Sequence, residues 1–68
     1  ENIIGEYQDL VLRKLQANGS LLLEKIVEEL DTTDSIRCFF AVLFLARDEK
    51  VDILQEEGNE EIRVTLIK

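Results

Sequence analysis

The residues from Ile36 to Ile62 constrain this chain most, because an apolar helical segment there gives way to the alternating pattern of a β-hairpin. From Ile36 to Ala46 the only charged residue is Arg37. A helix that serves only a small core keeps one polar face. We therefore expect part of this apolar surface to contact a partner protein.

The segment before this run predicts a first helix, from Asn2 to Ala17, because apolar residues recur there at helical spacing. Asn18 and Gly19 tolerate the left-handed conformation of a helix C-cap, so we expect the helix to stop there. Its predicted inward face comprises Ile3, Ile4, Tyr7, Leu10, Val11 and Leu15.

Two further helices are expected before the hairpin. Residues 20–22 are predicted to be extended and to lead into a second helix over residues 23–30, with Ile26, Val27 and Leu30 inward. Residues 31–34 read Asp-Thr-Thr-Asp and offer several N-caps for a third helix that runs to about Arg47. The sequence does not choose between these caps.

Beyond Lys50 the apolar period changes to two, which predicts a β-hairpin with residues 56–61 as its loop. The two predicted inward rows are Val51, Ile53 and Gln55 on one strand and Ile62, Val64 and Leu66 on the other. Three helices, a short extended segment and a terminal hairpin predict an α+β winged-helix fold. We expect residues 1–68 to form one such domain, a C-terminal piece of a longer protein.

The charge balance argues against binding to nucleic acid, and the composition argues against catalysis. Eight Lys and Arg stand against fifteen Asp and Glu, a net charge of −7, and such a chain repels a phosphate backbone. There is no His, no Gly-rich phosphate loop, and the single Cys38 lies in the apolar helix, where a thiol behaves as a small hydrophobe. We expect no enzyme, no cofactor, no metal site and no membrane span, and we interpret the acidic pairs as solvated charge.

The run Phe39-Phe40-Ala41-Val42-Leu43-Phe44-Leu45, then Lys50-Val51, then Gln55-Glu56-Glu57 and Ile62, resembles the C-terminal end of the kleisins. The similarity is greatest to the segregation and condensation protein A type of bacteria and archaea, and it extends weakly upstream to Gly19. This chain departs from the family at residues 58–61, where a Pro-Phe-Gly-Asp-type turn is common, and at Phe44, where Glu is common.

The resemblance implies a winged-helix domain that docks on the ATPase head of a structural maintenance of chromosomes (SMC) protein and closes a ring around DNA. In that family the ATP and Mg²⁺ belong to the head, and the kleisin domain carries no catalysis. The implied location is cytoplasmic and nucleoid-associated. The third helix and the hairpin are expected to lie against the edge of the head's sheet.

Winding the third helix at about 100° per residue separates a contact sector from a core sector. The contact sector contains Arg37, Ala41, Phe44 and Asp48, bordered by Phe40 and Leu45, and the core sector contains Phe39, Val42, Leu43 and Ala46. Phe44 is the predicted anchor. On the hairpin, Leu54 and Ile67 face away from the inward row and are expected to form a second apolar patch.

Two other functions stay open on the residues alone. A DNA-binding winged helix would place the third helix in the major groove, although Arg37, Arg47 and Lys50 are offset there by acidic neighbours. A homodimerisation or scaffold module would bury the third helix against its own copy.

Overall fold

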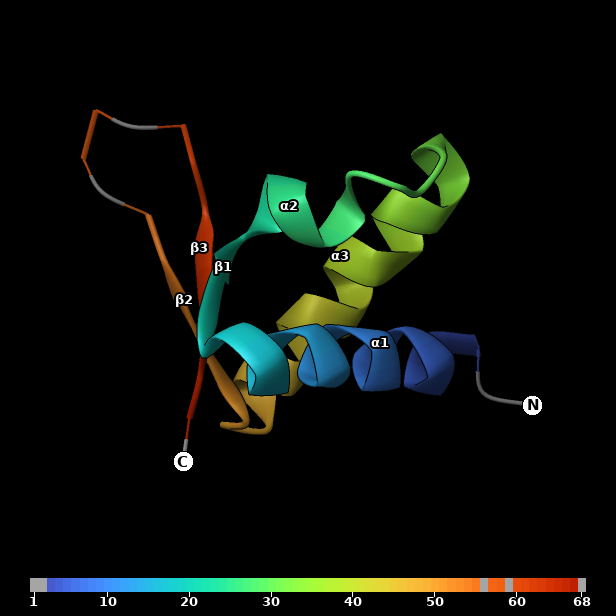
Figure 1. Cartoon of the computed structure of the whole chain (residues 1–68), viewed down its shortest axis with the longest axis horizontal. Coiled ribbons are helices and arrows are strands. Elements are labelled where there is room, and N and C mark those ends of the chain that lie inside the picture. The colour runs from blue at the N-terminus through green and yellow to red at the C-terminus, as the bar shows by residue number, and fades with distance from the viewer. Residues whose placement is uncertain (1–2, 56, 59, 68) are drawn as a thin grey trace.

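The computed structural model describes residues 3–55, 57–58 and 60–67 and contains three helices and a small antiparallel sheet (Figure 1). The elements follow one another as α1 (Ile3–Asn18), β1 (Ser20–Leu22), α2 (Leu23–Val27), α3 (Thr32–Arg47), β2 (Val51–Leu54) and β3 (Arg63–Leu66). The predicted α+β class is confirmed, and the arrangement is compatible with a winged-helix fold. The predicted helix start at Asn2, and Glu56 and Asn59 of the predicted loop, lie outside the described residues.

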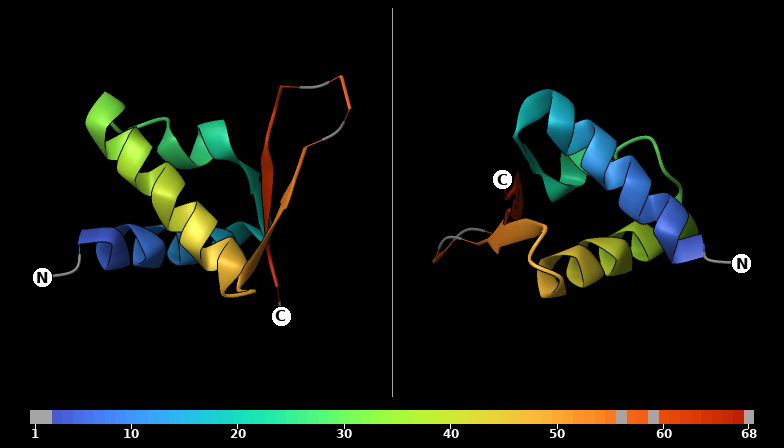
Figure 2. Two further views of the ribbon diagram at one scale, coloured as in Figure 1. Left: turned by 180° about the vertical axis from the view of Figure 1, so that it is seen from behind. Right: turned by 90° about the horizontal axis from the view of Figure 1, so that it is seen from below.

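The sheet has the strand order β1-β3-β2, so the last strand is the central one. Both neighbours run antiparallel to β3, with Leu21 opposite Val64 on one side and Ile53 opposite Val64 on the other. The predicted extended segment at residues 20–22 is thus the third strand of the sheet. The helices lie together on one side of the sheet (Figure 2).

The inward face of the hairpin follows the predicted alternation except at Gln55, which is predicted to face inward but is exposed just beyond the end of β2. Val51 and Val64 are buried and Ile53 and Leu66 are half-buried against the helices, while Asp52 on the opposite face is exposed. The core cluster joins these strands to α1, α2 and α3 through Val11, Leu15, Ile26, Cys38, Val42, Leu45, Val51 and Val64. The free thiol of Cys38 is buried, as expected.

The first two helices differ in detail from the prediction. Helix α1 stops where expected, because Gly19 adopts a positive φ of 78° and its N–H donates to the Leu15 carbonyl. Ile3, predicted to face inward, is 45% exposed at the first turn. Helix α2 ends at Val27, three residues earlier than predicted, and a turn continues the chain toward Leu30.

The ends of α3 are fixed by local hydrogen bonds. Asp31 is the N-cap, since its side chain accepts a hydrogen bond from the Asp34 N–H at 2.8 Å. At the other end, the Glu49 N–H donates to Ala46 and the Lys50 N–H donates to Leu45, which is the pattern of a Schellman motif. Glu49 occupies its left-handed position with a φ of 61°, where glycine is the usual residue.

No helix in the described part of the chain is long and apolar enough to cross a membrane.

We predict that Glu49→Gly raises the free energy of unfolding by roughly 0.5–1 kcal/mol. The left-handed conformation costs a non-glycine residue about 1–2 kcal/mol, and the larger backbone entropy of glycine in the unfolded chain offsets part of that gain. Urea denaturation of the two proteins measures the difference, and Glu57→Gly in the hairpin loop serves as the control. A loss of stability in Glu49→Gly would contradict the strained C-cap.

We predict that Cys38 reacts slowly with a thiol reagent at mildly alkaline pH. Burial raises the pKa of the Cys38 thiol, and the charge of Lys14 lowers it to a smaller extent. The folded state keeps the thiol proton to a higher pH than the unfolded state, so stability decreases as the pH rises through the ordinary thiol pKa.

The control for this labelling experiment carries Cys38→Ala together with Leu43→Cys, which moves the thiol to a position that is 42% exposed in the native protein. This variant is expected to react rapidly without denaturant, whereas Cys38 should react rapidly only in denaturing urea. Equal labelling rates in the folded proteins would show that Cys38 is accessible.

Candidate partner-binding surface

The outward side of α3 is a continuous apolar surface, which we call the α3 strip. In the left view of Figure 2, α3 crosses the near side of the molecule along its whole length. Its exposed apolar side chains are Ile36 (53% exposed), Phe39 (36%), Phe40 (49%), Leu43 (42%) and Phe44 (38%). Side chains of this size are normally buried, and a contiguous exposed group of them marks an interaction surface.

The inward side of α3 consists mostly of residues smaller than those of the α3 strip. Cys38, Ala41, Val42 and Leu45 are 0–2% exposed. Their spacing of three and four residues forms one narrow face. Small side chains allow the backbones of α1 and α3 to approach closely.

The predicted contact sector is therefore wrong in part. Ala41 and Leu45 are buried and cannot contact a partner, whereas Phe39 and Leu43, assigned to the core, are exposed. Phe40 and Phe44 lie at the surface as expected, and Val42 is buried as expected. The true core sector is rotated by roughly a quarter of a turn from the predicted one on a wheel of 100° per residue.

Arg37 and Asp48 flank the α3 strip and are exposed. Arg37 lies 3.9 Å from Asp34, and Asp48 lies 3.7 Å from Arg47. The guanidinium of Arg47 also covers the Phe44 ring, at 5.2 Å from its centroid. Phe44 is thus partly screened by a cation within its own helix.

The N-terminal end of α3 is held against α1 by a polar contact. The Tyr7 hydroxyl donates a hydrogen bond to the Asp34 carboxylate. This hydrogen bond raises the pKa of Tyr7 above its ordinary value. The contact helps to fix the direction in which the α3 strip faces.

Leu54 and Ile67 do not form the predicted second patch. They are 55% and 46% exposed on the outer face of the hairpin, but they lie at opposite ends of its ladder. Leu54 pairs with Arg63, which is four residues before Ile67 on β3 and its continuation. At 3.3 Å per residue, Leu54 and Ile67 are therefore roughly 13 Å apart along the strand direction. Asp52 and Thr65, which pair between them, interrupt the apolar surface.

Within the described sheet, strand β2 pairs on one side only and leaves its other backbone edge available. The Ile67 N–H donates to the Lys50 carbonyl at 3.0 Å, and the Leu66 N–H donates to Gly19 on the β1 side at 2.9 Å. Because hydrogen-bonded pairs alternate in an antiparallel ladder, Asp52 and Leu54 bond to β3, and the backbone groups of Val51 and Ile53 point to the outer edge. This edge begins directly after the C-terminal end of α3.

Helix α2 adds a hollow that the sequence did not predict. It measures about 440 Å³ and lies between α2 and the N-terminal half of α3. Its walls are Leu23, Val27, Leu30, Thr32, Ser35, Ile36, Phe39 and Phe40. The spacing of Ile36, Phe40 and Leu43 groups these residues on one side of α3, but it does not tell whether that side faces the core or the surface.

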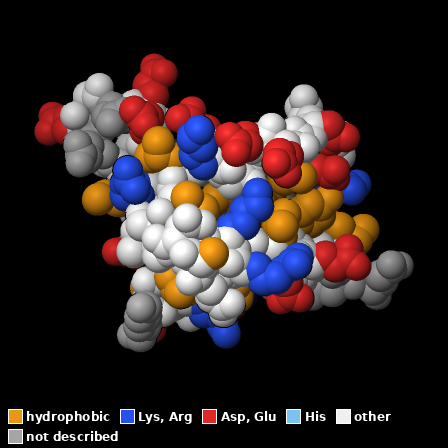
Figure 3. Space-filling view, in the orientation of Figure 1, with side chains coloured by type: hydrophobic (Ala, Val, Ile, Leu, Met, Phe, Trp, Pro, Cys, Tyr) orange, Lys and Arg blue, Asp and Glu red, His pale blue; other side chains and the backbone are white. Residues whose placement is uncertain are grey.

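The described residues contain no group of three or more His, Cys, Asp or Glu side chains that could hold a metal ion. On the face in Figure 3, acidic side chains run across the upper part, from the hairpin tip to the N-terminal end of α3. Lys and Arg side chains also lie on this face, most of them below the acidic row.

Comparison with known proteins does not assign the chain to a group. No protein-family model matches it, and no curated protein has a significantly similar sequence.

Proposed function

We propose that this chain is a non-catalytic protein–protein interaction domain, the C-terminal winged-helix domain of a kleisin, and that it docks on the ATPase head of an SMC protein. The α3 strip is the observation that carries this proposal, because it leaves five large apolar side chains exposed along one helix. The resemblance of residues 39–62 to kleisins of the segregation and condensation protein A type supplies the identity of the partner.

The proposed interface has an apolar centre and a polar border. Phe40, Leu43 and Phe44 are the proposed anchors, and Arg37 and Arg47 stand at the border. A buried apolar centre with a charged rim is typical of protein interfaces, and aromatic side chains dominate their binding energy. The proposal also places the domain in the cytoplasm, at the nucleoid.

The free edge of β2 extends the proposed interface. A strand at the edge of the SMC head's sheet would hydrogen-bond to the outward backbone groups of Val51 and Ile53, which is β-strand addition. The Schellman motif fixes β2 directly after α3, so the apolar anchors and the strand edge are presented together. Two contacts held in one rigid arrangement lose little further entropy on binding.

Duplex DNA is a weaker candidate for the same surface. Helix α3 offers aromatic and aliphatic side chains where a recognition helix carries polar groups for base edges. The net charge of −7 opposes the phosphate contacts that dominate affinity.

We predict that Leu43→Ala and Phe44→Ala each weaken binding to the SMC head by about 2 kcal/mol, or roughly thirtyfold, if they remove interface anchors. Calorimetry with the head from the same source measures the affinity, and circular dichroism checks that each variant folds. Ile67→Ala removes a side chain of similar exposure from the outer face of the hairpin and is expected to change the affinity little.

Equal losses in Ile67→Ala would move the interface to the outer face of the sheet. No binding of the head by the folded wild-type domain would overturn the proposal, and concentration-dependent mass of the domain alone would favour homodimerisation through α3 instead.

We also predict that the Val51 and Ile53 amides exchange rapidly with deuterium in the free domain and slowly in the complex. Their N–H groups point to the open edge of β2, and strand addition would give them acceptors. The Thr65 amide, on the central strand, should be protected in both states. Unchanged exchange at Val51 and Ile53 in a formed complex would exclude β-strand addition at this edge.

A further inference from the structure

A second hollow adjoins the one beside α3. It measures about 410 Å³ and lies on the hairpin side of α2, and Leu23 and Val27 line both hollows. We call the two adjoining hollows together the α2 groove.

The two ends of the α2 groove differ in chemistry. At the α3 end, the walls are apolar or neutral, with Ile36, Phe39 and Phe40 as the large side chains. At the hairpin end, an apolar floor is bordered by three carboxylates. The floor is formed by Leu23, Val27 and Ile62, and the carboxylates belong to Glu24, Glu60 and Glu61.

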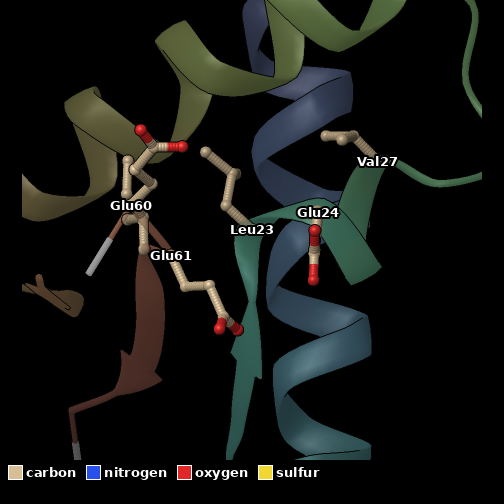
Figure 4. Close-up of a pocket in the computed structure, with 6 residues that line it drawn as sticks. Leu23, Glu24, Val27, Glu60 and Glu61 are labelled. Atoms are coloured by element: carbon tan, nitrogen blue, oxygen red, sulfur yellow. The ribbon is translucent and has the colours of Figure 1, made fainter.

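The hairpin end combines side chains from segments far apart in the sequence. Figure 4 shows Leu23, Glu24 and Val27 on α2 facing Glu60 and Glu61, which precede β3, and the two latter carboxylates point in opposite directions. The Leu23 N–H donates to the Ile62 carbonyl at 2.7 Å, which holds the two segments together at the base of the groove. The hairpin end is therefore built into the fold.

The charged side chains among the described residues that line the groove are all acidic. None of the described residues that line its two hollows is Lys or Arg. The cation nearest in sequence, Lys25, has its ammonium 3.6 Å from the Glu28 carboxylate. Three carboxylates around an apolar floor, on a chain of net charge −7, favour a cation whose stem is itself apolar.

We infer that the α2 groove binds a short segment of another protein that has apolar residues at one end and Lys or Arg at the other. The apolar side chains pack between α2 and α3 on Ile36, Phe39 and Phe40. The aliphatic stems of the basic residues cover Leu23, Val27 and Ile62, and their charged groups reach the carboxylates of Glu24, Glu60 and Glu61. The charge asymmetry fixes the direction in which the segment lies.

This site goes beyond the proposed docking on an SMC head. It shares Ile36, Phe39 and Phe40 with the α3 strip, but its carboxylates lie on α2 and the hairpin. A second copy of this chain is a poorer occupant, because it brings the same net charge of −7.

The test is selection of peptides from a displayed random library, about twelve residues long, on the wild-type chain. We expect the enriched sequences to combine apolar residues with Lys or Arg at one end. Enrichment of peptides without basic residues, or no enrichment, would overturn the inference.

A matched pair of variants locates the binding of an enriched, fluorescein-labelled peptide by anisotropy. Removing three charges from the groove, with Glu24→Gln, Glu60→Gln and Glu61→Gln, is expected to weaken binding about tenfold, with a smaller loss at high salt. Removing three charges elsewhere, with Glu6→Gln, Asp9→Asn and Asp52→Asn, should change it less than about twofold, as expected of distant screened charges. Equal losses would show a general charge effect and overturn the site.

Calorimetry of both triple variants with the SMC head distinguishes the two proposals. If the wild-type chain binds the head but enriches no peptide, the groove alone is rejected. Peptide binding by a chain that does not bind the head would reject the docking proposal alone.

Discussion

The packing of α1 against the narrow inward face of α3 is the contact on which the rest of the structure depends. Helix α3 turns its smaller side chains, including Cys38, Ala41 and Val42, toward the core, where α1 contributes Val11 and Leu15. A helix has only one such face, so the large side chains of α3 must point outward once this contact forms. The exposed aromatic surface is thus a consequence of how the core is packed.

The domain leaves many large apolar side chains exposed for its size. Among the described residues, eight large hydrophobic side chains are exposed and nine hydrophobic residues are buried. A chain of 68 residues has little core from which to draw stability. A partner that covers the α3 strip binds only the folded state, so it would stabilise the domain by mass action. Stability and partner binding are therefore expected to be coupled.

The elements and their order could be predicted from the sequence, because the apolar period changes clearly after Lys50 and Gly19 ends α1. The side of α3 that faces the core could not be predicted from the sequence. From Ile36 to Ala46 every residue but Arg37 is apolar, so periodicity alone does not single out the core side, and the choice depends on which side chains α1 can approach. The strand edge and the α2 groove also depend on long-range pairing, between segments such as Leu23 and Ile62 that are distant in sequence.

The position of β3 makes the sheet dependent on a segment late in the chain. Both outer strands bond to Arg63–Leu66 and to nothing else in the described sheet. Neither ladder can form on the ribosome until these residues have left the exit tunnel. The three helices are synthesised earlier, and their apolar faces stay uncovered until the sheet forms. A ribosome that stalls before Arg63 would therefore hold a chain with an open core, a substrate for chaperones and proteases rather than a partially working domain.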